Sequence, residues 1–135
     1  MKGDSIAVQF AMVALGGAVG AVARYILTII VPSDEPLSWG VFAANFIGCF
    51  LICFISFAFF DMTQIKRLFL FIGFFGAFTT MSSVSLEMVQ YSTEVFPVGA
   101  FLFFVLSAAI CLAAGFMGRW LASTLQFPNI RTISR

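Results

Sequence analysis

The sequence predicts an all-α integral membrane protein with four transmembrane helices, and three observations lead to that fold class. Of the 135 residues, 61% are hydrophobic and only 10% are charged, whereas a soluble domain carries about 25% charged residues. The chain contains 19 Phe, a side chain that is mostly buried in soluble proteins. The apolar residues also fall into four long segments, each close to the roughly 20 residues that a helix needs to cross the bilayer core.

The four helices are expected at residues 6–31, 39–60, 68–91 and 98–125. Residues 32–36, with a Pro at each end, stop the first helix, and Asp61 stops the second. Pro97 begins the fourth, where its missing N–H costs least. Because the linkers are short, we expect consecutive helices to pack antiparallel in one membrane domain, residues 1–125, followed by a polar tail, residues 126–135.

The first helix has an alternative interpretation. Lys2, the apolar stretch after it and the sequence Ala21-Val22-Ala23 resemble a signal peptide with a small-residue cleavage site. The apolar run continues to Val31, well past that site, so a retained transmembrane helix fits better.

Small residues predict where the helices touch. Gly16 and Gly20 have the spacing of a GxxxG motif, Gly17 starts the same pattern one residue later, and Gly48 lies in the second helix. Such residues let helix backbones approach closely in lipid. We expect these four glycines to serve in helix packing, and the alternative is that they are tolerated without forming an interface.

Lys and Arg mark the cytoplasmic side of a membrane protein. On the side of the N-terminus lie Lys2, Lys66, Arg67, Arg119, Arg131 and Arg135. The two loops on the other side contain acidic residues but no Lys or Arg, and only Arg24 leans that way. This bias predicts a multi-pass protein of the cell (inner or plasma) membrane with both termini in the cytoplasm.

Function in a membrane protein is expected where polar groups lie at membrane depth. Arg24 could attract anions at a pore mouth, or it could extend to the nearer interface. Asn45 could join two helices or donate its N–H groups to an anion. Ser107 could line a path, or it could bond a carbonyl of its own helix.

The most unusual polar stretch is residues 73–85. It combines two Gly with five hydroxyl residues within seven positions, a composition that weakens a helix and can satisfy freed carbonyls. We expect the third helix to be broken in mid-membrane between Gly76 and Thr80, where carbonyls would form a cation site and hydroxyls a path of donors. An unbroken helix with a polar packing face is the alternative.

Several functions are not expected. The chain has no His, the commonest general base and metal ligand, and no nucleophile–base pair, so we expect neither an enzyme nor an organic cofactor. The net charge of +1 gives no indication of nucleic-acid binding. Cys49, Cys53 and Cys111 lie inside apolar runs and are expected to be small apolar fillers.

Three motifs follow one another along the chain. They are residues 17–25, GAVGAVARY; residues 45–51, NFIGCFL; and residues 73–80, GFFGAFTT, followed by Ser82, Ser85 and Glu87. In this order they resemble the patterns G-x-x-x-G-A-x-x-R-Y/W, N-x-x-G-S-F-L and G-F-x-G-G-F/L-T-T-F-S-T-F-S-x-E of the small bacterial fluoride channels, the Fluc or CrcB family.

The resemblance implies a channel subunit that lets fluoride leave the cytoplasm passively and so relieves fluoride toxicity. Family members pair antiparallel in the bilayer as dual-topology dimers, with a structural sodium ion at the dimer interface. Carbonyls matching Gly76 and Thr79 would hold that sodium ion, and Arg24 would lie in the vestibule. The implied pathway positions are Asn45, Thr80, Met81, Ser82, Ser83, Val84, Phe103 and Ser107.

Several pathway positions depart from the family pattern. Met81 and Val84 replace two phenylalanines whose ring edges line the path, and Phe103 replaces a tyrosine. Together with the one-sided charge, these departures favour a fixed-orientation subunit of a heterodimer, whose partner is a second chain of opposite bias. A homodimer, a weakly or non-conducting structural partner, and a small multidrug-type antiporter are the alternatives. The antiporter requires a Glu in the first helix, and none is present.

Overall fold

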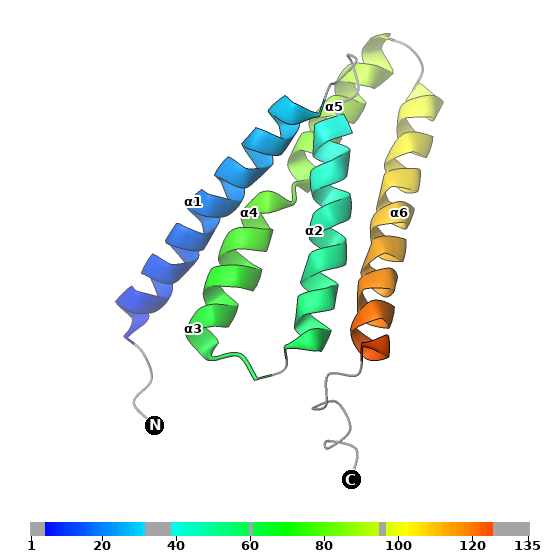
Figure 1. Cartoon of the computed structure of the whole chain (residues 1–135). Helices are drawn as coiled ribbons and strands as arrows, with labels where there is room; N and C mark the ends of the chain where they lie inside the picture. The colour runs from blue at the N-terminus through cyan, green and yellow to red at the C-terminus, as the bar shows by residue number, and fades with distance from the viewer. Residues whose placement is uncertain (1–4, 32–38, 60, 95–96, 126–135) are drawn as a thin grey trace.

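The computed structural model describes residues 5–31, 39–59, 61–94 and 97–125 as a bundle of helices (Figure 1). The helices are α1 (Ile6–Ile30), α2 (Trp39–Ala58), α3 (Gln64–Arg67), the π-helix η1 (Leu68–Phe75), α4 (Gly76–Phe78), α5 (Met81–Glu94) and α6 (Pro97–Thr124). The elements from α3 to α5 follow one another as the third long segment. The described residues thus contain four segments long and apolar enough to cross a membrane, which confirms the all-α class. The predicted tail lies outside the described residues.

The helix lengths match a bilayer. The shortest of the four segments, α2, has 20 residues and extends about 30 Å at about 1.5 Å per residue, the thickness of the hydrocarbon core. At the start of α1, the hydroxyl of Ser5 accepts a hydrogen bond from the Val8 N–H at 3.4 Å and so caps the helix. Pro97 is the first residue of α6.

The third segment begins at Gln64 rather than near residue 68, because the basic residues Lys66 and Arg67 belong to the helix α3. Lys and Arg are good helix formers, and their long stems reach the membrane interface. Their charge ends an apolar run in the sequence without ending the helix. Leu68–Phe75 is then π-helical, which the apolar pattern alone does not reveal.

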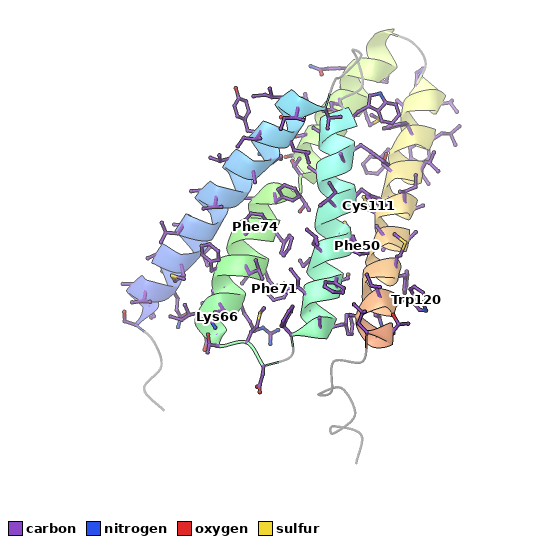
Figure 2. All side chains as sticks on the ribbon, viewed as in Figure 1. Phe50, Lys66, Phe71, Phe74, Cys111 and Trp120 are labelled. Atoms are coloured by element: carbon purple, nitrogen blue, oxygen red, sulfur yellow. The ribbon has the colours of Figure 1, made fainter. Side chains whose placement is uncertain are left out.

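The segments alternate in direction, so α2 and α6 run parallel to each other (Figure 1). Figure 2 shows Lys66 and Trp120 at the same end of the bundle, which is also the end where α1 begins and α6 ends. Apolar side chains cover the outside of the bundle, with Phe10 73% and Phe116 68% exposed. Helices that are apolar on all sides are typical of proteins solvated by lipid.

Glycines allow α1 to pack on η1. A Cβ atom on Gly16 would overlap the Phe69 carbonyl oxygen, and one on Gly20 would overlap the Phe74 carbonyl oxygen. From the other side, a Cβ on Gly73 would lie 2.9 Å from the Gly16 Cα. Gly17 is less crowded, since its nearest neighbour would be the Gly73 oxygen at 4.0 Å.

Glycines also bring α6 against α2. A Cβ on Gly118 would overlap the Phe50 carbonyl oxygen, and one on Gly115 would lie 3.8 Å from the Cys49 carbonyl oxygen. Gly48 on α2 faces the methyl group of Thr79 and the ring of Phe78. The close contact of α2 with α6 places the side chains of both helices along one shared groove.

The third segment is interrupted between α4 and α5 (Figure 1). Thr79 leaves the helical region with φ −85° and ψ 149°, and α5 starts again at Met81. Thr79 and Thr80 are the last two residues of the stretch in which the sequence predicts a break. The interruption positions the candidate site.

Candidate functional site

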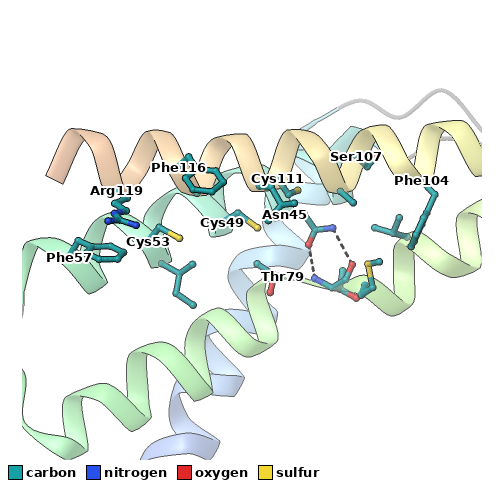
Figure 3. A pocket seen from close by; sticks show the side chains of 17 residues that line it. Asn45, Cys49, Cys53, Phe57, Thr79, Phe104, Ser107, Cys111, Phe116 and Arg119 are labelled. Carbon is teal, nitrogen blue, oxygen red and sulfur yellow. Dashed lines mark hydrogen bonds between the residues drawn. The ribbon is translucent and has the colours of Figure 1, made fainter. Parts of the chain in front are cut away.

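The side chain of Asn45 on α2 bonds both backbone groups of Thr80 at the interruption. Its Nδ2 donates to the Thr80 carbonyl at 3.1 Å, and its Oδ1 accepts from the Thr80 N–H at 2.7 Å (Figure 3). An unpaired backbone group away from water costs several kcal/mol in lipid. Asn45 therefore satisfies the N–H that the interruption frees at Thr80 and adds a donor to the Thr80 carbonyl, at a residue that is 7% exposed.

Thr80 is also the N-cap of α5. Its Oγ1 accepts from the Ser83 N–H at 3.2 Å, the third residue of the helix, as N-cap side chains do. The Thr80 hydroxyl donates to Ser83 Oγ at 3.1 Å. Because a hydroxyl has one proton, the 3.1 Å contact between Thr80 and Ser82 has Ser82 as its donor. Three hydroxyls thus form one network at the start of α5.

The interruption redirects two helical hydrogen bonds. In a continuous helix the Thr80 N–H would donate to the Gly76 carbonyl and the Ser83 N–H to the Thr79 carbonyl, but they donate to Asn45 and to Thr80 Oγ1 instead. The Thr79 N–H and hydroxyl both donate to the Phe75 carbonyl, at 3.1 and 2.9 Å. The carbonyls of Gly76 and Thr79 therefore lose their usual donors.

A groove of about 570 Å³ runs along α2 and α6 and reaches the interruption (Figure 3). At its polar end lie Asn45, Thr80 and Ser107, with Met81 and Val84 beside them. The Ser107 hydroxyl is buried and has no hydrogen-bond partner among the described residues. A buried polar group without a partner is costly, so this hydroxyl is an available donor in the wall of the groove.

The groove walls are two stripes of residues, each spaced by four. On α2 the stripe is Asn45, Cys49, Cys53 and Phe57, and on α6 it is Ser107, Cys111, Gly115 and Arg119. Residues four apart share one helix face. Because α2 and α6 run parallel, the two stripes run in the same direction on opposite walls of the groove. At the far end, the Arg119 guanidinium lies 5.0 Å from the centroid of the Phe57 ring, a cation–π contact.

A second cavity, of about 420 Å³, lies between α1, α2 and α5. Arg24 lines it together with Ser83 and Glu87. Arg24, the predicted vestibule residue, thus lines a different cavity from Asn45 and Ser107. Ser83 joins the two places, since it lines the second cavity and bonds Thr80.

The structure brings most, but not all, of the predicted pathway residues to the groove. The residues that line it are Asn45, Thr80, Met81, Val84 and Ser107. The hydroxyls of Ser82 and Ser83 hydrogen-bond to Thr80 at its edge. The Met81 side chain is 57% exposed, whereas Val84 is 7% exposed and belongs to the small core.

Phe103 does not line the groove. It packs edge-on against Trp39, with ring centroids 6.4 Å apart, and near Phe42 at 6.5 Å. Its neighbour Phe104 lines the groove instead. Phe103 precedes Ser107 by four residues and so starts on the same face of α6, but its ring turns toward Trp39 and Phe42 of α2.

The part of the groove away from the interruption was not predicted from the sequence. Arg119 was expected only to add to the charge bias, and the three cysteines were expected to be apolar fillers, yet all four side chains line the groove. The four-residue spacing within each helix was the available signal. It becomes interpretable once α2 and α6 are known to be parallel neighbours.

Comparisons with known proteins identify the family of the chain. Residues 11–119 match the family described as CrcB-like protein, Camphor Resistance (CrcB). The chain is similar to proteins named fluoride-specific ion channel FluC. In Magnetococcus marinus the relative is 35% identical over 82% of this chain and 94% of its own length. In Bacteroides fragilis the values are 38%, 77% and 91%, and in Geobacter sulfurreducens 39%, 78% and 90%. The chain belongs to the CrcB family.

Proposed function

We propose that this chain is a subunit of a fluoride channel through which fluoride leaves the cytoplasm passively, relieving fluoride toxicity, and that fluoride passes along the groove between α2 and α6. The relatives named as fluoride-specific channels support fluoride as the ion that is conducted. The observation that carries the route is the polar end of the groove, where Ser107, whose buried hydroxyl has no partner among the described residues, lines the groove together with Asn45 and Thr80.

Hydrogen-bond donors at the interruption suit a small, strongly hydrated anion. An anion that enters the groove must exchange its water shell for donors of the protein. Ser107 offers its hydroxyl, and the Asn45 amide has two N–H bonds, one of which is used on Thr80. The first N–H groups of α5 and the positive end of its dipole add further attraction for an anion.

Basic residues support an entry for anions at the other end of the groove. Arg119 lines that end, on the side of the bundle where Lys66 lies (Figure 2). With both termini in the cytoplasm, as the charge bias favours, this end faces the compartment that fluoride leaves. A positive potential at a pore mouth raises the local concentration of an anion.

A second subunit in antiparallel orientation would complete the pathway. Met81 exposes 57% of its surface beside the groove. Gly76 is exposed, and a Cβ atom placed on it would meet no other atom closer than 4.0 Å, so both residues are available to a partner. The one-sided distribution of Lys and Arg fixes a single orientation, which favours a homologous partner chain of opposite bias. In that heterodimer, the pathway that contains Met81 and Val84 would be the weaker one.

A structural sodium ion fits the chemistry of the interruption. Carbonyl oxygens that have lost their N–H donors are hard ligands for a cation, and Gly76 and Thr79 provide two of them. Two carbonyls from one chain leave room for an equal set from the partner. The ion would hold the two interruptions together across the subunit interface in the middle of the membrane.

Fluoride efflux from liposomes tests the function. The reversed variant K2Q/K66Q/R67Q/R131Q/R135Q/D34K/E35K/E94K leaves Arg119 alone on the original side against three Lys on the opposite loops and is predicted to insert upside down. Reconstituted with the unmodified chain, it supplies the missing orientation. We expect a fluoride electrode to record efflux from vesicles that hold both chains and little efflux from vesicles that hold either chain alone.

The outcomes separate the parts of the proposal. Vesicles that hold both orientations, verified by protease protection, and release no fluoride would refute the conducting role and favour a structural partner. Full efflux from the unmodified chain alone would support the channel and refute the fixed orientation. The control S85A removes only an exposed hydroxyl that donates to the Met81 carbonyl and should leave efflux unchanged.

A further inference from the structure

Two cysteine side chains face each other across the groove. Cys49 on α2 and Cys111 on α6 both line the groove, and Figure 3 shows their side chains near each other across it. Neither cysteine is in a disulfide, and each is half-buried. The pair is therefore a reduced dithiol that a solute in the groove can reach.

The backbone around the pair is held closely. One turn further along α6, a Cβ on Gly115 would lie 3.8 Å from the Cys49 carbonyl oxygen, and Gly118 meets the Phe50 carbonyl oxygen. Contacts between backbones at glycine leave little freedom to move α2 away from α6. The two sulfur atoms are thus positioned before any ligand arrives.

From this geometry we infer that Cys49 and Cys111 form a two-coordinate binding site for a soft divalent d10 metal ion, Hg²⁺. Soft ions prefer thiolate ligands, and two thiols on facing helices can hold one ion between them. Nothing in this inference depends on whether the groove conducts fluoride.

The binding reaction balances without an oxidant. Hg²⁺ takes the place of the two thiol protons, which pass to water, and two sulfur–mercury bonds form in a neutral complex. A neutral complex suits the apolar wall of the groove, because burying an unpaired charge is costly. Two thiols on one scaffold also outcompete separate monothiols, since their effective concentration is on the order of millimolar or higher.

The same residues exclude zinc. Structural Zn²⁺ takes four ligands in a tetrahedron, and the described ranges contain no group of three or more His, Cys, Asp or Glu side chains able to hold a metal. Cys53 lies one turn from Cys49, but its sulfur faces Gly115, at 3.1 Å from a Cβ placed there. Cys53 therefore has no opposing thiol and serves as the matched control.

Metal retention by the full chain in detergent tests the site. The protein is loaded with Hg²⁺, passed through gel filtration in excess glutathione, and its metal content is measured by mass spectrometry. We expect about one Hg²⁺ per chain for the unmodified protein and for C53S, and nearly complete loss for C49S and C111S. C49A and C111A repeat the test with a different side chain, and circular dichroism with elution volume verifies that each variant is folded.

Each result decides the matter. Retention that needs both Cys49 and Cys111 and not Cys53 supports the site. No retention by the unmodified chain, or equal retention by folded C49S, overturns it. Equal loss in C53S overturns the two-coordinate assignment, and so does retention of Zn²⁺ under the same wash.

Discussion

The substitution Asn45→Ala tests how the interruption in the third segment is stabilised. It removes both hydrogen bonds to Thr80, at 3.1 and 2.7 Å, and leaves the Thr80 N–H unpaired at a residue that is 7% exposed. The Thr80 carbonyl still accepts the first hydrogen bond of α5, as an N-cap carbonyl does. Leaving one buried polar group unsatisfied costs about 1–3 kcal/mol, so we predict a loss of that size in the free energy of unfolding, in the lower half of the range if water enters the groove.

The assay is unfolding in detergent by titration with SDS, followed by the fluorescence of Trp39 and Trp120. The matched control S85A removes a side-chain hydrogen bond at an exposed position of α5, the helix that Thr80 caps. It should change stability by less than about 0.5 kcal/mol. Hydrogen exchange at the Thr80 N–H should rise in N45A and not in S85A. If N45A unfolds at the same SDS concentration as S85A and the unmodified chain, Asn45 does not stabilise the interruption.

Four further substitutions separate packing, donation and charge. G20A should destabilise the chain by about 1–3 kcal/mol through overpacking, because its methyl group would overlap the Phe74 carbonyl oxygen. G17A, with 4.0 Å of space, should be neutral or gain up to about 1 kcal/mol of helix propensity, and equal SDS midpoints for the two would contradict the packing. S107A should lower fluoride efflux about tenfold, and normal efflux would exclude this hydroxyl from the path. Its stability should stay constant or rise by about 1 kcal/mol, because the hydroxyl that it removes is buried without a partner among the described residues. R119Q should slow efflux at low salt and have a smaller effect near 1 M salt, where screening acts within about 3 Å, and a defect independent of salt would argue against attraction at the groove mouth.

The four apolar segments could be predicted from the sequence, because a membrane requires long apolar helices whatever their neighbours are. Which helix packs against which face of another helix could not be predicted from the sequence. Gly16 and Gly20 indicated a close backbone approach, but only the structure identifies η1 as the element that approaches them. The π-helical geometry of η1 also left no mark in the apolar pattern.

The site was predicted in part for the same reason. For Asn45 the sequence left joining helices and donating to an anion equally open, and the structure shows that it joins α2 to Thr80 while one N–H remains. Phe103 is in register with Ser107 on α6, but its ring packs on Trp39 and Phe42 and Phe104 lines the groove instead, which spacing alone does not predict. Cys49 and Cys111 are 62 positions apart in the chain, so their contact depends on parallel packing that no local pattern encodes.

The most direct measurement of the central claim is the release of fluoride and chloride from the same liposomes, holding the unmodified chain together with its reversed variant. The account predicts that fluoride leaves while chloride is retained, because the donors of Ser107 and Asn45 line a groove that is polar over only a short stretch. Vesicles that retain both ions, or lose both at equal rates, would contradict it.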